Sequence, residues 1–195
     1  MSNPLLLFVG PSGCGKTTVA QELECKNNYK TIQSYTTRAK RYEDEIGHVF
    51  ISEDEFDKLN NIVAYTKYNG YRYCTTQEQL DEAITYVVDI PGVDTLLQNY
   101  KTSRPILIFY FDTTVTTRID RMLDRGDSDN AIVSRLHNDE AYNWFDKLDE
   151  IIWRHNYKNR TSRVELHRIN ANEMLSKVIE QIMYYIKRTG EMSKW

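Results

Sequence analysis

A glycine-rich segment near the start of the chain has the residue types and the spacing that hold nucleotide phosphates. Gly10-Pro-Ser-Gly-Cys-Gly-Lys16-Thr17 matches the pattern G-x-x-x-x-G-K-[ST]. In such a loop the backbone N–H groups converge on phosphate oxygens, the lysine reaches the β- and γ-phosphates, and the threonine hydroxyl binds Mg²⁺. The segment therefore predicts an ATP site with Mg²⁺ as cofactor. Its residues are Pro11, Ser12, Gly13, Cys14, Gly15, Lys16, Thr17 and Thr18.

Arginines later in the chain have the chemistry to stabilise a phosphoryl group during transfer. Arg118, Arg121 and Arg125 follow one another at i, i+3 and i+7, which places them on one face of a helix, and Arg135 comes next. A guanidinium grips phosphate oxygens with two parallel hydrogen bonds, and phosphoryl transfer depends mainly on positioning and charge stabilisation. The catalytic candidates are therefore Lys16, Arg121, Arg125 and Arg135. The alternative is a solvated helix face, because aspartates lie between these arginines.

The elements that must position these residues alternate between buried strands and helices. Leu5–Val9 is a continuous apolar run that ends at the glycine-rich loop, and a helix is expected from Gly15 to about Lys26. Further strands are expected at Ala83–Ile90, Arg104–Phe111 and Val164–Ile169. The other expected helices are about Val93–Tyr100, Val115–Arg125, Ala131–Phe145, Leu148–Tyr157 and Glu173–Lys187. This alternation predicts an α/β fold whose parallel sheet is covered by helices on both faces.

One acidic residue stands where such folds often orient the metal. Asp89 is at the end of the expected strand Ala83–Ile90. An acid at this position commonly orients Mg²⁺ or its water ligands in proteins with this kind of phosphate loop. The alternative is an aspartate that only caps the helix that follows.

Residues 34–82 have a different character from the rest of the chain. They are polar, rich in tyrosine, and carry Asn69-Gly70 between Ile62–Tyr68 and Tyr71–Thr75. An Asn-Gly pair between alternating aromatic runs is a strong signal for a β-hairpin. We therefore expect a small β-rich insertion between the first and second halves of the sheet.

Composition narrows the class of protein. The hydrophobic fraction of 41% and the charged fraction of 27% are typical of a globular domain, and the formal net charge is −3. An acidic chain is not expected to bind nucleic acid, and no apolar run reaches the ~18 residues of a membrane span. Three cysteines without metal-ligand spacing indicate free thiols, and the first residues lack a signal-peptide pattern. We expect a single cytoplasmic domain.

Three motifs in the same order give the chain a resemblance to the guanylate kinase family, the GMP-phosphorylating branch of the P-loop nucleoside monophosphate kinases. They are the glycine-rich loop, the segment Ser34-Tyr-Thr-Thr-Arg38-Ala-Lys-Arg41, and Arg121-Met-Leu-Asp-Arg125-Gly126 followed by Arg135. The resemblance implies a parallel core, a β-rich acceptor-binding insertion and a mobile helical lid. The implied ranges are 1–33, 83–117 and 146–195 for the core, 34–82 for the insertion, and about 118–145 for the lid.

The resemblance also implies where the acceptor nucleotide binds. Arg38, Arg41 and Tyr73 are implied to hold its phosphate, and Ser34 and Thr75 to reach its base. His48 stands where the family has a phosphate-binding tyrosine. The full set of implied acceptor-binding residues is Ser34, Arg38, Arg41, His48, Tyr73, Thr75 and Asp89.

The chain departs from the family where the acceptor base is read. The family places a glutamate before the hairpin, which accepts hydrogen bonds from N1–H and the 2-amino group of guanine, whereas this chain has Ala64. Of the family's Asp-x-Asp after the second core strand, only Asp89 remains. An unpaired buried donor costs about 1–3 kcal/mol, so a pyrimidine or a modified base fits Ala64 better. Alternatively, a carboxylate comes from elsewhere, the candidates being Glu43, Asp44, Glu45 and Glu78.

The motifs together predict an ATP-dependent nucleoside monophosphate kinase with a GMP- or dGMP-like acceptor. One alternative is a kinase for a non-guanine or modified nucleotide, or a P-loop kinase for another small molecule. A second alternative is a non-catalytic binding module related to the family. Such modules typically have degraded phosphate loops and lack the lid arginines, whereas this chain keeps both.

The first prediction concerns Lys16. Replacing it by alanine removes a charge that balances the transferring phosphoryl group, so Lys16→Ala is expected to lose several kcal/mol of transition-state stabilisation. The fold is expected to stay intact. The measurement is the rate of ADP release from ATP in a clean preparation, with circular dichroism as the control for folding. Retained phosphoryl transfer would count against the assigned site.

Overall fold

A computed structural model describes residues 3–40, 43–140, 143–159 and 164–192. Its centre is a four-stranded sheet in the order β6-β1-β7-β8, in which every neighbouring pair is parallel. The strands are β1 (Leu5–Val9), β6 (Thr85–Val87), β7 (Ile106–Asp112) and β8 (Val164–Asn170). All five residues of β1 are fully buried, which explains their uninterrupted apolar sequence.

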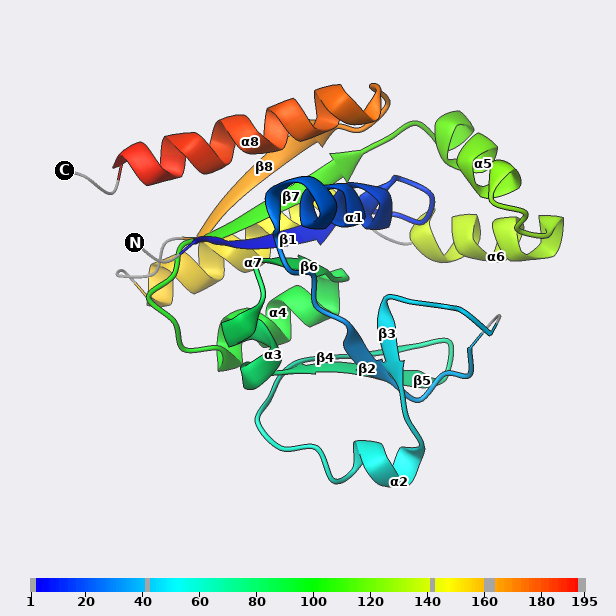
Figure 1. Cartoon of the computed structure of the whole chain (residues 1–195), viewed down its shortest axis with the longest axis horizontal. Coiled ribbons are helices and arrows are strands. Elements are labelled where there is room, and N and C mark those ends of the chain that lie inside the picture. Colours follow the sequence, from blue (N-terminus) through cyan, green and yellow to red (C-terminus); the bar gives the residue numbers. More distant parts are fainter. Residues whose placement is uncertain (1–2, 41–42, 141–142, 160–163, 193–195) are drawn as a thin grey trace.

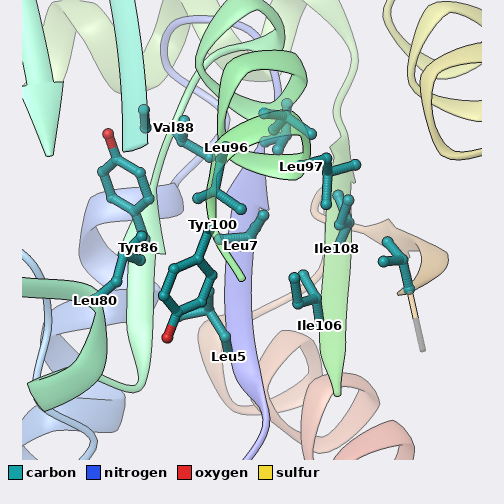
Figure 2. Close-up of a cluster of buried hydrophobic side chains, with 14 of the residues drawn as sticks. Leu5, Leu7, Leu80, Tyr86, Val88, Leu96, Leu97, Tyr100, Ile106 and Ile108 are labelled. Atoms are coloured by element: carbon teal, nitrogen blue, oxygen red, sulfur yellow. The ribbon is translucent and has the colours of Figure 1, made fainter. Parts of the chain in front are cut away.

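Helices cover both faces of this core sheet (Figure 1). On one face α1 (Lys16–Asn27) and α8 (Leu175–Met192) pack against Leu6 and Phe8. On the other face α4 (Ile90–Asn99) and α7 (Trp144–Lys158) pack against Leu5 and Leu7. Figure 2 shows this second cluster, where Leu96 and Leu97 of α4 lie over the side chains of β1 and β7. The predicted α/β class, with helices on both faces of a parallel sheet, is confirmed.

The β-rich insertion forms a second sheet in the order β3-β2-β5-β4. Its strands are β2 (Ser34–Thr36), β3 (His48–Phe50), β4 (Ile62–Tyr68) and β5 (Tyr71–Thr76), and it also carries α2 (Glu53–Phe56) and α3 (Gln77–Glu82). The predicted hairpin is confirmed as β4 and β5. Asn69 and Gly70 both have positive φ, at 49° and 83°, as a two-residue hairpin turn requires. This sheet lies below the carboxyl ends of the core strands in Figure 1.

Two helices project on the other side of the phosphate loop. They are α5 (Val115–Asp124) and α6 (Asp129–Glu140), which meet at a turn around Gly126 (Figure 1). The expected helix Ala131–Phe145 is therefore interrupted, because α6 ends at Glu140 and α7 begins at Trp144. Residues 141–142, between these two helices, lie outside the described part of the chain.

The expected strand Ala83–Ile90 is longer than the strand in the structure. Only Thr85–Val87 pairs as β6, because Asp89 leaves the sheet to cap α4 and Ile90 is already helical. Within the described residues, no helix is both long enough and apolar enough to cross a membrane.

Candidate functional site

Two cavities meet at the phosphate loop. The larger, of about 650 Å³, lies between this loop, α5, α6 and the start of α8. The smaller, of about 240 Å³, lies between the loop, the insertion sheet and the carboxyl end of β6. Ser12 and Lys16 line both cavities. A group bound in one cavity therefore faces a group bound in the other across the side chain of Lys16.

The phosphate loop lines the larger cavity with nearly all of its predicted residues. Seven of them contribute, namely Ser12, Gly13, Cys14, Gly15, Lys16, Thr17 and Thr18. Pro11 does not line this cavity; it is buried. Lys16 Nζ donates to the carbonyl oxygens of Gly10 and Pro11, at 2.7 and 2.8 Å. The ammonium group is thus held at the loop, where phosphate oxygens would offer it stronger, charged partners.

Three predicted arginines also face the larger cavity. Arg121, Arg125 and Arg135 line it together with the loop. Arg121 donates to the carbonyl of Cys14 at 3.2 Å and to that of Ala171 at 2.8 Å. Arg125 pairs with Asp127, and Arg135 Nε lies 3.7 Å from the same carboxylate. The structure therefore brings together cations from α5 and α6 that are far from the loop in sequence.

Four of the predicted acceptor-binding residues line the smaller cavity: Ser34, His48, Tyr73 and Asp89. Ser34 Oγ and His48 Nδ1 are 2.9 Å apart, and the His48 ring meets the Tyr73 ring edge to face at 5.6 Å. Ser34 and His48 are direct neighbours on β2 and β3, which fixes this pair in register. The cavity thus has a polar wall of hydroxyl and imidazole groups.

The predicted phosphate-binding arginines are less accessible. Arg38 is 9% exposed and donates to both carboxylate oxygens of Glu45, at 3.0 and 2.9 Å. Glu45 therefore engages both terminal nitrogens of the guanidinium, and Arg38 does not line the smaller cavity. Arg41 lies outside the described residues.

The deep end of the insertion sheet, by which we mean the buried pair Ala64 on β4 and Thr75 on β5, carries no charged side chain. Ala64 is paired with Thr75, and both side chains are buried, so neither lines the cavity. Thr75 Oγ1 is buried without a hydrogen-bond partner among the described residues, and the Tyr86 hydroxyl is its polar neighbour. Alternation along β4 places Ala64 on the same side as Thr66, which does line the cavity.

The carboxylates considered as substitutes for a glutamate at position 64 do not line the smaller cavity. Glu45 is engaged by Arg38, and Glu78 accepts from Asn61 on the solvent-exposed side of the insertion. Glu43 and Asp44 are exposed. The residue that pairs with Ala64, Thr75, and the next residue on the same side of β4, Thr66, both carry hydroxyl groups.

Comparisons with known proteins identify the family. The family model described as "Guanylate kinase" matches residues 1–152 of this chain. The guanylate kinase of Lactococcus lactis subsp. lactis is 30% identical, and the match covers 96% of this chain and 92% of that protein. The chain belongs to the guanylate kinase family.

Other members of the guanylate kinase family agree with this assignment. The guanylate kinase of Clostridium tetani is 28% identical over 92% of this chain and 97% of that protein. The crystal structure of guanylate kinase from Anaplasma phagocytophilum has a TM-score of 0.53 at 15% identity, covering 97% of this chain and 87% of that one. At this identity the structural match supports the fold.

Asp89 caps a helix and also lines the smaller cavity. Its Oδ1 accepts a hydrogen bond from the Gly92 N–H at 2.8 Å and thereby caps α4, as the alternative interpretation proposed. Burial raises the pKa of the Asp89 carboxyl, and hydrogen bonds from Gly92 and Thr66 offset part of that effect.

Several residues that line the smaller cavity escaped the sequence analysis. They are Thr66, Tyr68, Tyr86, Val87, Val88, Asp139 and Trp144. Tyr86 stands three residues before Asp89, near the end of a parallel strand, and that position is a usable signal because ligands bind at carboxyl ends of such strands. Asp139 follows Arg135 by one helical turn, a spacing that places both on one face of α6. Trp144 had no comparable signal.

The second prediction concerns Asp89. Because folding raises the pKa of this carboxyl, its ionised form destabilises the folded state. This cost is absent below the pKa of an unfolded aspartate, about 3.9, and complete above the raised folded value. Asp89→Asn keeps an oxygen for the Gly92 N–H and removes the charge, so we expect a higher melting temperature at pH 7.5 than the parent and no gain near pH 4.

The same variant should lose activity, because an amide is a poor partner for a cation. We expect a fall of about tenfold or more in phosphoryl transfer. Asp89→Ala is the matched control, since it loses the cap as well as the charge and should melt below Asp89→Asn. An Asp89→Asn variant that melts below the parent at pH 7.5 would contradict the assignment of a buried, costly charge.

Proposed function

We propose that this chain transfers the γ-phosphoryl group of ATP to a nucleoside monophosphate, giving ADP and a nucleoside diphosphate. The observation that carries the proposal is that two cavities share Ser12 and Lys16 at the phosphate loop. Phosphoryl transfer requires donor and acceptor oxygens held in line with little covalent help from the protein. Two adjoining cavities with one lysine between them meet that requirement.

On the donor side, the loop amides and Lys16 would hold the ATP phosphates in the larger cavity. Arg121, Arg125 and Arg135 would then stabilise the charge that spreads over the transferring group. Arg125 and Arg135 now share Asp127, so phosphate oxygens must compete with that carboxylate for both. We propose that α5, α6 and the turn between them act as a lid whose closure makes this exchange and excludes water.

Mg²⁺ fits the same arrangement. The Thr17 hydroxyl lines the larger cavity, and the buried Asp89 carboxylate lines the smaller one. Both are oxygen donors of the kind that Mg²⁺ takes from proteins when phosphates and waters supply its other ligands. When bound, Mg²⁺ would neutralise charge on the ATP phosphates, and Asp89 would act on it directly or through water.

On the acceptor side, the phosphate would be held by Arg38 and Tyr73, with His48 beside them. Arg38 must exchange the Glu45 carboxylate for phosphate oxygens or share itself between the two. His48 is already oriented by Ser34. Arg41, which lies outside the described residues, completes the set by family resemblance. We propose residues 34–82 as the acceptor-binding part of the chain.

The family makes GMP or dGMP the first acceptor to test. Guanine presents two adjacent N–H donors, which a carboxylate reads better than hydroxyl groups do. Two carboxylates line the smaller cavity, but Asp89 caps α4 and Asp139 pairs with Arg118. The polar groups next to Ala64 are the hydroxyl of Thr75 and, against it, that of Tyr86, and burial raises the pKa of the Tyr86 phenol. Hydroxyl groups both donate and accept, so we propose that selection for the 2-amino group is weak. The three free cysteines support activity in a reducing compartment such as the cytoplasm.

The third prediction is the acceptor profile. ADP release from ATP·Mg²⁺ is measured with GMP, dGMP, IMP, AMP, CMP, UMP, dTMP and dUMP, with Lys16→Ala as the blank. We expect GMP to be phosphorylated, and kcat/KM for IMP to fall within about tenfold of that for GMP. If only pyrimidine nucleotides are phosphorylated, the acceptor is a pyrimidine nucleotide and the guanine-like assignment is wrong. If no nucleotide is phosphorylated, the kinase proposal itself fails.

The fourth prediction restores a carboxylate at the deep end. In Ala64→Glu the new side chain starts on the cavity side of β4, next to the unpartnered hydroxyl of Thr75. We expect the ratio of kcat/KM for GMP over IMP to rise by about tenfold, equivalent to one charged hydrogen bond. Ala64→Gln has the same shape without the charge and should not raise the ratio.

The measurement must separate specificity from stability, because Ala64 is 1% exposed and a buried carboxylate destabilises the fold. Melting temperatures of both variants therefore accompany the kinetics. A folded Ala64→Glu protein whose GMP to IMP ratio equals that of the parent would show that position 64 does not contact the base.

A further inference from the structure

A buried ion pair holds the backbone of Ser12 from both sides. Arg118 Nε donates to the Ser12 carbonyl oxygen at 2.7 Å, and Asp139 Oδ2 accepts from the Ser12 N–H at 2.9 Å. Arg118 Nη2 also donates to Asp139 Oδ2, which closes the arrangement. Three segments that are far apart in sequence therefore meet at one residue of the phosphate loop.

The pair is buried and tightly packed. Arg118 is 6% exposed and Asp139 is 8% exposed. A Cβ at Gly13, whose φ is +78°, would lie 2.7 Å from the Arg118 carbonyl oxygen, so the loop touches α5 directly. Trp144 Nε1 donates to the Asp139 carbonyl at 3.1 Å, which ties the end of α6 to the start of α7. The sequence placed Arg118 on the same helix face as Arg121 and Arg125, but it binds protein groups instead of lining the larger cavity.

The negative charge of Asp139 lies beside a loop that is expected to bind phosphates. An aspartate beside a phosphate loop repels phosphates unless its charge is balanced, and Arg118 supplies that balance. Buried ion pairs seldom add stability over apolar side chains of similar size. What this pair provides is geometry, because it fixes the carbonyl and the N–H of Ser12 at once. Ser12 lies where the two cavities meet, so its peptide groups set the direction of the loop between them.

We propose that Arg118 and Asp139 are positioning residues that preorganise the phosphate loop for nucleotide. They hold Ser12 so that the N–H groups that follow it point into the larger cavity. They also fix the inner ends of α5 and α6 to the loop, whereas Arg125 and Arg135 lie nearer the turn between those helices. The role of the pair in anchoring α5 and α6, the proposed lid, rests on the proposed kinase function. Its role in nucleotide binding at the loop does not.

The main variant removes both charges at once. In Arg118→Met/Asp139→Leu no unpaired charge stays buried, so the protein is expected to fold with a melting temperature near that of the parent. Arg118→Lys is the second variant, because it keeps the positive charge but lacks the fork that reaches Ser12 and Asp139 together. Arg104→Met is the matched control. Arg104 also holds backbone carbonyls, those of Asn3, Leu80 and Ala83, but lines neither cavity of the site.

The experiment is calorimetric titration with ADP·Mg²⁺, together with hydrogen exchange at the amides of residues 12–16. For the double variant we expect ADP affinity to fall about tenfold or more and exchange at these amides to become faster. Arg118→Lys should show a smaller change in the same direction. Arg104→Met should lower the melting temperature and leave ADP affinity within about twofold of the parent.

Two results would overturn the proposal. One is a folded double variant with parental ADP affinity and parental exchange at the loop. The other is a double variant that fails to fold while Arg118→Lys folds with parental ADP affinity, because the pair would then serve stability alone. ADP binding needs no acceptor, so these results are independent of whether the parent phosphorylates any nucleoside monophosphate.

Discussion

Every proposed step depends on the phosphate loop, whose backbone must stay accessible to phosphate although the elements on either side of it are buried. The loop leaves β1, whose five residues are fully buried, and enters α1 at Lys16, one residue before Thr17, which lines the larger cavity. Burial of β1 between two helical layers fixes where the loop begins (Figures 1 and 2). Its own direction is fixed by Arg118 and Asp139, which act on Ser12. A rigid loop matters because amides that already point at the phosphate need no reorganisation when it binds.

The cations of the site are the second constraint, because those among the described residues have oxygen partners within the protein. Lys16 is held by two carbonyls, Arg38 by Glu45, and Arg125 by Asp127. Phosphate oxygens must displace or share these partners, which lowers the net gain from each contact. The same partners keep long side chains ordered near the cavities, so less rotamer freedom is lost on binding.

Much of this arrangement follows from local sequence. An unbroken apolar run predicted β1 to the residue, and the glycine spacing predicted the loop and the helix that follows it. Asn69-Gly70 predicted the hairpin, since few other pairs adopt positive φ twice in succession. The short helices α2 and α3 were missed although both begin with a capping box, formed by Ser52 with Glu55 and by Thr76 with Gln79.

What the sequence could not supply was the set of contacts between distant segments. Nothing near Asp139 signals that it meets Ser12, since 127 positions separate them. The position of Tyr86 near the carboxyl end of β6 hinted at a site, but its neighbours in the cavity, which come from the insertion, did not follow from the sequence. Arg38 carried a motif for phosphate binding, whereas its contact with Glu45 depends on how the chain returns from β2 to β3. Such contacts arise from tertiary structure, which residue spacing along one element does not encode.

The central claim is that two nucleotides bind end to end, with their phosphates meeting at Ser12 and Lys16. The most direct test is calorimetric titration with adenosine and guanosine joined 5′ to 5′ by five phosphates, compared with ADP and with GMP alone. If the two cavities form one continuous site, the linked compound binds with 1:1 stoichiometry and far more tightly than either nucleotide, because the second contact becomes intramolecular. A linked compound that binds no more tightly than ADP would contradict the account, since the two cavities could then not be filled together.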